Sequence, residues 1–150
     1  MRFAEFRTGQ VIEAGPYRLE EAEILDFARR YDPQWFHLDP AAAARSAWGS
    51  VIASGWQTCA IAMRLAVDAA LADSESFGSP GLDYLKWPNP VRAGDALSLR
   101  AEVVGTRRSK SRSSLGMLHW RWQLFNQDGA EVLDLTATSL FDLGRGQVRP

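Results

Sequence analysis

The sequence has few residues that form disulfides or bind metals, and no large excess of charge of either sign. It contains one cysteine, Cys59, and two histidines among 150 residues. A single cysteine cannot form a disulfide within the chain, which favours a reducing compartment. Two histidines and one cysteine, widely scattered, argue against a structural zinc site. The formal net charge of −1 provides no overall basic field that would hold nucleic acid or an anionic membrane.

Long hydrophobic runs are also missing from the sequence. No stretch approaches the length of a membrane span, and Met1–Arg7 lacks the apolar core of a signal peptide. Hydrophobic residues still make up 46% of the chain and charged residues 23%, which is the balance of a folded globular protein. We therefore expect one domain over residues 1–150, located in the cytoplasm, with neither nucleic acid nor a membrane as partner.

Helical patterns occupy the first half of the chain. Apolar residues recur at helical spacing from Glu20 to Tyr31, with acidic residues near the start and two arginines near the end, an order that complements the helix dipole. Pro33 cannot continue this helix. A short helix is predicted over Pro40–Ala47, with Asp39 as its N-cap. The longest helix, Ser54–Ala72, is apolar on nearly every side, so we expect other elements to enclose it.

The second half alternates apolar and polar residues with a period of two, which is typical of antiparallel strands with one face on a core. Asn126–Gly129 is a hairpin signal between the last two strands. Ser74–Pro80 is predicted to be a loop. Strands are predicted over residues 82–87, 97–104, 118–124 and 133–141, with an earlier one within residues 10–17.

These elements predict an α+β fold in which a curved antiparallel sheet wraps around the long central helix. Such a sheet has open edges, and an open edge is often closed by pairing with another subunit. We therefore expect a homodimer or a higher homo-oligomer.

Residues with catalytic chemistry gather just before the long helix. Asp32 and His37 lie five positions apart, on a segment that follows the first helix. A carboxylate and an imidazole can share one proton-transfer task, because both can be tuned to titrate near neutral pH. Ser54 and Gly55 open the long helix, whose N-terminus offers unpaired N–H groups to a developing oxyanion. The pattern predicts an acid–base pair facing a site that polarises a carbonyl group.

Each of these residues also has a plainer interpretation. Asp32 can cap a turn, and His37 can be a hydrogen-bonded turn histidine. Ser54 is first of all a helix N-cap, with a substrate contact as a weaker second role. Gln34 is either a contact of the substrate or of its neighbours, or a turn residue. The combination of Asp32, His37 and Gly55 favours the catalytic interpretation.

The segment DPQWFHLD, which begins at Asp32, is followed by GSVIASGW, which begins at residue 49. Together they resemble the signature of MaoC-like dehydratases and (R)-specific enoyl-CoA hydratases, a family with the hot-dog fold. The resemblance implies that Asp32 and His37 flank a water that adds across the double bond of an enoyl thioester. It also implies that the backbone N–H of Gly55 polarises the thioester carbonyl.

Two residues depart from the usual motif of this family. Gln34 stands where the motif usually has Asn, and Trp35 where it usually has Pro. Gln34 keeps the amide chemistry but has one more rotatable bond. Trp35 adds a large ring beside the predicted site, where it either narrows the acyl pocket or covers it. We count both among the expected substrate-binding residues.

Arg107, Arg108 and Lys110 belong to the one basic run of the chain. This run is either a solvated hairpin loop or a patch that attracts the phosphates of coenzyme A.

The expected reaction is the reversible hydration of a trans-2-enoyl thioester to a 3-hydroxyacyl thioester. Coenzyme A is the expected carrier, and the sequence leaves acyl carrier protein open as the alternative. The (R) configuration is implied by the resemblance alone. Water is the second substrate, so no metal and no organic cofactor are expected, and coenzyme A enters only as part of the substrate. The alternatives are a hot-dog acyl-CoA thioesterase and a non-catalytic acyl-thioester-binding protein. The sequence does not tell which of Asp32 and His37 is the base.

Overall fold

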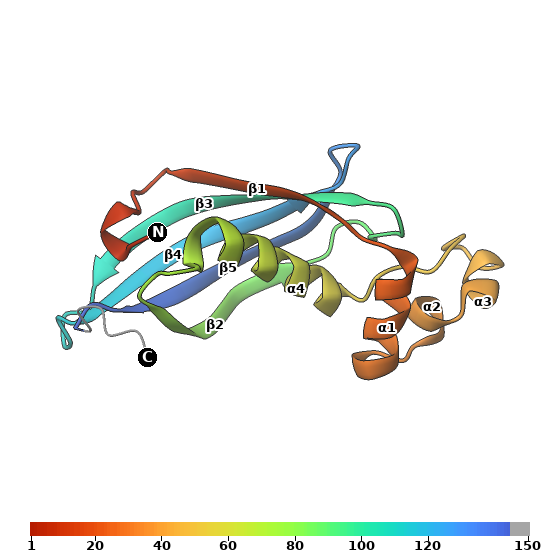
Figure 1. Cartoon of the computed structure of the whole chain (residues 1–150), viewed down its shortest axis with the longest axis horizontal. Coiled ribbons are helices and arrows are strands. Elements are labelled where there is room, and N and C mark those ends of the chain that lie inside the picture. The colour runs from red at the N-terminus through yellow and green to blue at the C-terminus, as the bar shows by residue number, and fades with distance from the viewer. Residues whose placement is uncertain (145–150) are drawn as a thin grey trace.

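A computed structural model describes residues 1–144 of the chain, and its five strands form one antiparallel sheet (Figure 1). The strand order is β1-β3-β4-β5-β2. Helix α4 (Gly55–Ala66) lies along one face of this sheet. The strands are β1 (Val11–Arg18), β2 (Ser76–Lys86), β3 (Ala96–Arg108), β4 (Leu115–Phe125) and β5 (Glu131–Asp142). The predicted α+β arrangement of a long helix against an antiparallel sheet is confirmed.

The core lies between α4 and the sheet. Along β4 every second side chain is buried, which is the alternation that the sequence predicted. From α4, Ile61, Ala62 and Leu65 face the same core. The turn between β4 and β5 is the predicted hairpin, in which Asn126 N–H donates to Ala130 O at 3.0 Å and Gly129 has a φ of +75°.

Three helices lie beyond one end of the sheet, near the N-terminus of α4 (Figure 1). They are α1 (Glu21–Tyr31), α2 (Trp35–Leu38) and α3 (Pro40–Ala44). The side chain of Asp39 accepts the Ala42 N–H at 3.0 Å, as expected of the N-cap of α3. Helix α2 was not predicted, because four residues are too few to show a helical period.

The long helix differs from the prediction in two ways. It changes at Val67 to a π-helical segment, η2 (Val67–Leu71), instead of continuing unchanged to Ala72. It is also not enclosed on all sides, because the sheet covers only one of its faces. Trp56, Ala60 and Met63 form an apolar stripe at helical spacing that faces solvent in the single chain.

The prediction of a loop over Ser74–Pro80 is wrong, because β2 already begins at Ser76. Within residues 1–144, β2 is an edge strand that pairs with β5 alone. An edge position tolerates Pro80, which has no N–H to donate, and glycines, which accompany the register shifts near Gly78 and Gly81.

Across residues 1–144 we find no helix both long enough and apolar enough to cross a membrane.

Candidate active site

Asp32 and His37 lie in contact at the N-terminal end of α4. Asp32 is the residue at which α1 ends, and its backbone N–H donates to Ala28 O at 3.0 Å. His37 lies on α2, one short turn beyond Pro33. The distance between His37 Nε2 and Asp32 Oδ2 is 3.3 Å. The termination of α1 by the Asp32-Pro33 pair therefore places the carboxylate and the imidazole face to face.

The orientation of the His37 ring is fixed by the backbone of Ile52. His37 is buried, and its Nδ1 lies 2.7 Å from Ile52 O, while Ile52 N–H donates to Phe36 O at 3.1 Å. A carbonyl oxygen can only accept, so Nδ1 carries a hydrogen and Nε2 is the nitrogen that faces Asp32. The contact between Nε2 and the carboxylate is attractive only while one proton lies between these two atoms.

Both oxygens of the Asp32 carboxylate accept hydrogen bonds. Ser54 Oγ donates to Oδ2 at 2.7 Å, and Gln34 Nε2 donates to Oδ1 at 2.7 Å. The hydrogen bond from Ser54 is the largest cause that lowers the pKa of Asp32, with Gln34 and His37 adding to it against the opposing effect of burial. Asp32 is therefore a carboxylate at neutral pH.

Gly55 is the first residue of α4, so its N–H has no acceptor within the helix. Among residues 1–144 no other group accepts a hydrogen bond from this N–H. The ring of Trp87 packs directly against Gly55, because a Cβ atom at this position would lie 2.4 Å from Trp87 Cε2. The missing side chain thus makes room for an indole of the protein itself.

A cavity of about 330 Å³ adjoins this cluster. His37, Gly55 and Thr58 contribute to its lining, together with the rings of Trp48 and Trp87. The remaining lining residues are Ile52, Ala53, Pro88, Asn89, Pro90, Val91 and Val132. A mostly apolar cavity lined by a few polar groups suits an apolar chain that carries a polar head.

The tryptophans that line the cavity are not the one that the sequence predicted. Trp35 is half-exposed and stacks edge-on against Phe36, and it does not line the cavity. Trp48 and Trp87 line the cavity instead. No pattern in the sequence singles out these two residues, because an isolated tryptophan is most often core or interface bulk.

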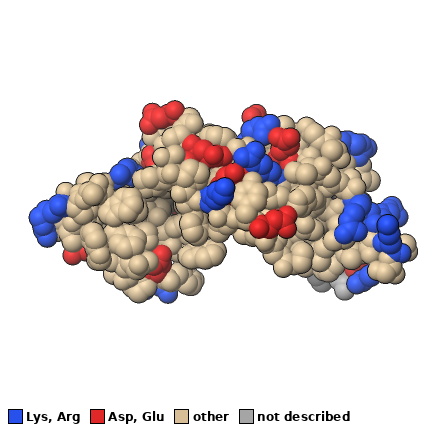
Figure 2. All heavy atoms as spheres, turned by 180° about the vertical axis from the view of Figure 1, so that it is seen from behind, with Lys and Arg blue, Asp and Glu red and all other residues tan. Residues whose placement is uncertain are grey.

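The basic run lies far from this cluster within one chain. Arg107 and Arg108 end β3, and Lys110 lies in the following turn. This turn is at the end of the sheet opposite to α1, α2 and α3 (Figure 1). Figure 2 shows Lys and Arg side chains gathered at that end of the molecule. One chain therefore does not bring the basic run together with Asp32.

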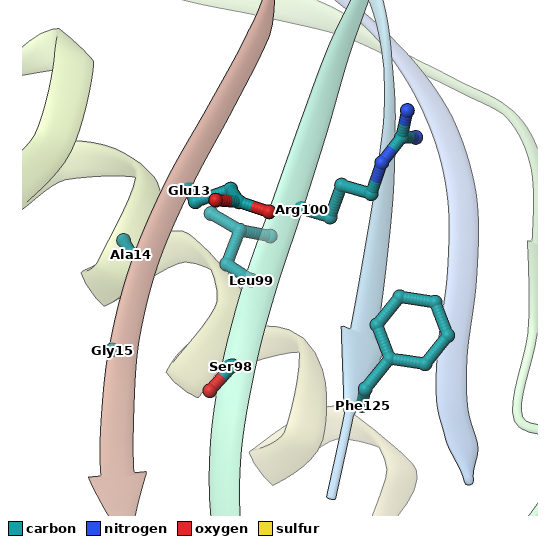
Figure 3. A pocket seen from close by; sticks show the side chains of 7 residues that line it. All are labelled: Glu13, Ala14, Gly15, Ser98, Leu99, Arg100 and Phe125. Atoms are coloured by element: carbon teal, nitrogen blue, oxygen red, sulfur yellow. The ribbon is translucent and has the colours of Figure 1, made fainter. Parts of the chain in front are cut away.

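A second cavity, of about 400 Å³, lies on the face of the sheet opposite to α4 (Figure 3). Glu13, Ser98, Arg100 and Phe125 surround it. The Arg100 guanidinium donates to Glu102 at 2.9 Å. Within residues 1–144 we find no group of three or more His, Cys, Asp or Glu side chains that could hold a metal ion.

A helix laid on an antiparallel sheet, with an Asp–His pair at the helix N-terminus, defines a protein of the hot-dog class. The family described as MaoC like domain matches residues 4–117, and the chain belongs to this family.

The chain is similar to proteins that are covered over nearly their whole length. YdeM, an uncharacterised protein of Bacillus subtilis (strain 168), is 28% identical over 134 residues, which are 89% of this chain and 94% of YdeM. The structure of a MaoC-like dehydratase from Rhodospirillum rubrum has a TM-score of 0.83 and 36% identity, over 98% of this chain and 97% of that one. The (R)-hydratase from A. caviae, involved in PHA biosynthesis, has a TM-score of 0.68 and 26% identity, over 90% and 96% of the two chains.

Proposed function

We propose that the protein is a hydro-lyase that reversibly hydrates a trans-2-enoyl thioester of coenzyme A to a 3-hydroxyacyl thioester. The observation that carries this proposal is the 3.3 Å contact between His37 Nε2 and Asp32 Oδ2, beside an apolar cavity and the first amide of α4. Similar proteins named as a dehydratase and an (R)-hydratase support the reaction class and the (R) configuration.

The proposed reaction moves two protons and polarises one carbonyl group. The water oxygen bonds to C3 while the electron pair of the C2=C3 bond shifts toward the carbonyl and forms an enolate. The N–H of Gly55 donates to the enolate oxygen, and one such donor is typically worth about 2.7–4 kcal/mol of barrier. The water proton leaves to a base, and an acid delivers a proton to C2 as the thioester carbonyl re-forms.

Asp32 and His37 fit these two proton transfers. Asp32 is held as a carboxylate by its donors, so it is unprotonated and can accept the water proton. Nε2 of His37 lies 3.3 Å from Asp32 Oδ2, and when it bears a proton it suits the acid that protonates C2. In the dehydration direction the two roles reverse. Because the two groups are in contact, we expect kinetics to report apparent pKa values of the pair.

The test is the loss of enoyl-thioester absorbance with purified protein, across short, medium and branched enoyl-CoA substrates. Asp32→Asn and His37→Ala should each lower kcat by at least about 100-fold, the usual contribution of a positioned acid or base. Both variants should keep the circular dichroism spectrum of the wild type. Retained hydration in both variants would rule out the proposed roles.

A matched assay separates hydration from thioester hydrolysis. A saturated acyl-CoA has no double bond to hydrate, so we expect no release of free thiol from it. Thiol release that depends on Asp32 would instead indicate a thioesterase.

We also propose that the protein forms a homodimer along β2. This strand is an edge of the sheet, and its unpaired backbone groups can pair with a second β2. Leu82 pairs with the buried Ala137, so it lies on the sheet face that carries α4, yet it is 47% exposed. With Trp56 and Met63 of α4 it offers the kind of apolar surface that marks an interface.

A further inference from the structure

Ser54 links two parts of the proposed site that are 22 positions apart in the sequence. Its side chain is buried, and its Oγ donates to Asp32 Oδ2 at 2.7 Å. The same Oγ accepts the N–H of Trp56 at 3.3 Å, as the N-cap of α4. The hydroxyl therefore connects the acid–base pair to the end of the helix that carries the oxyanion amide.

These contacts leave Ser54 little capacity to bind substrate. A hydroxyl has one hydrogen to donate, and that hydrogen goes to Asp32. Ser54 is also absent from the lining of the cavity. The role of a substrate contact, expected from the sequence, does not match this placement.

We propose that Ser54 is a positioning residue that holds Asp32 Oδ2 against His37 Nε2, a role that rests on the proposed hydration. Gln34 binds only Oδ1, so it leaves Oδ2 without a second donor of its own. Asp32 also stands at the C-terminal end of α1, where the negative end of the helix dipole disfavours a carboxylate. A buried hydroxyl that points at Oδ2 offsets this unfavourable location.

Few groups around Asp32 other than Ser54 could hold its Oδ2 atom. From α2 the only titratable contact is His37, and from the start of α4 the contact is the hydroxyl of Ser54. On α1 itself, Arg29 and Arg30 are exposed, and Arg30 pairs with Asp26 at 3.4 Å. Within residues 1–144, Asp32 makes no ion pair other than its contact with His37.

The experiment compares Ser54→Ala and Ser54→Thr with the wild type across pH. In Ser54→Ala we expect kcat to fall about 10- to 100-fold, since a hydrogen bond to a charged group is lost, and KM to change less than about twofold. Hydration needs the Asp32 carboxylate, and removal of the donor raises the pKa of Asp32, so the acid limb of the kcat profile should move to higher pH. Ser54→Thr keeps a hydroxyl and should restore most of the activity.

Two controls separate positioning from helix capping. Ser74 has a hydroxyl with the same pattern beyond the other end of the helix, donating to Leu71 O at 2.7 Å and accepting Ser76 N–H at 3.1 Å. Ser74→Ala should leave kcat and its pH profile unchanged. Ser54→Gly keeps most of the capping, because glycine is an accepted N-cap, but it lacks the hydroxyl. It should lose as much kcat as Ser54→Ala while losing less stability.

A carbon-13 NMR titration of the Asp32 carboxyl group tests the same contact without turnover. The pKa of Asp32 should be higher in Ser54→Ala than in the wild type. An unchanged pKa, or a rise in KM with unchanged kcat, would overturn the positioning role. If the wild type hydrates no enoyl thioester, the proposed function fails, and the titration still decides whether Ser54 holds the carboxylate.

Discussion

Gly55 cannot readily be replaced by a residue with a side chain, for two reasons. It begins α4 and presents a free N–H, and the ring of Trp87 occupies the space that any side chain would need. Trp87 also contacts the ring of Trp56 edge-on, at 5.4 Å between ring centroids. The indole is therefore held from two sides, and it forms part of the cavity wall beside His37.

We expect Gly55→Ala to lower the free energy of unfolding by about 1–3 kcal/mol, the usual cost of overpacking. The Cβ atom would lie 2.4 Å from Trp87 Cε2, so the ring has to move. In a Trp87→Ala background the same substitution should cost far less, which urea unfolding of the four proteins can measure as a double-mutant cycle. Gly105→Ala is the control, because no atom lies within 4 Å of its Cβ position. Equal costs in the two backgrounds would contradict the packing argument.

At the scale of elements, a carboxylate on β5 joins three neighbouring strands on the face of the sheet opposite to α4. Asp134 accepts two hydrogen bonds from Arg121 of β4, at 2.8 and 2.9 Å, and one from Tyr84 of β2 at 2.9 Å. The hydrogen bonds from Arg121 are the largest cause that lowers the pKa of Asp134. The group thereby fixes the edge strand β2 to the rest of the sheet.

The lowered pKa of Asp134 makes the stability of the folded protein depend on pH. A carboxylate whose pKa is lower in the folded protein stabilises the fold above its unfolded pKa of about 3.9, and this contribution is lost as pH falls through the folded pKa. Asp134→Asn should therefore cost about 1 kcal/mol at pH 7, a modest value because Arg121 is partly exposed. The difference in free energy of unfolding between this variant and the wild type should shrink toward pH 3.

Urea unfolding of Asp134→Asn and the wild type at both pH values measures this difference. Asp68→Asn is the control, since Arg64 and Asp68 form an exposed pair on one helix turn. It should change stability little at either pH. A constant difference between Asp134→Asn and the wild type across pH would refute the assignment.

At the scale of the molecule, the apolar surface of β2 and α4 is the feature that the single chain leaves unexplained. Trp56 is 59% exposed, Met63 48% and Leu82 47%. None of the three belongs to the core between α4 and the sheet, and Leu82 lies on the edge strand β2. In the proposed dimer a second copy pairs with the edge of β2 and covers Leu82, and we expect it to cover the stripe on α4 as well.

Leu82→Lys should convert the proposed dimer to a monomer, because it places a charge in the middle of this surface. Light scattering at micromolar concentration would show the mass of two chains for the wild type and of one chain for the variant. Val104→Lys is the matched control, since Val104 is 49% exposed but lies on β3, away from β2. A monomeric wild type would disprove the dimer.

Elements with a long, regular period were predicted well from the sequence. The alternation within β3, β4 and β5 and the helical period of α1 need only local sterics and one buried face, and both are visible in the residue order. β2 was predicted late and too short, because its glycines and proline hide the period of an edge strand. The four residues of α2 were missed because so short a helix shows no period in the sequence.

The sequence by itself determined that a carboxylate and an imidazole, Asp32 and His37, lie close along the chain and are separated by a proline that ends a helix. Only the tertiary structure decided what surrounds them. Ser54 reaches Asp32, and Trp87 reaches Gly55, across chain separations that no local pattern encodes. The basic run at 107–110 is placed at the opposite end of the sheet by the length and direction of β3. Local sterics fix periods and caps, whereas distances between remote side chains depend on how the whole sheet packs on α4.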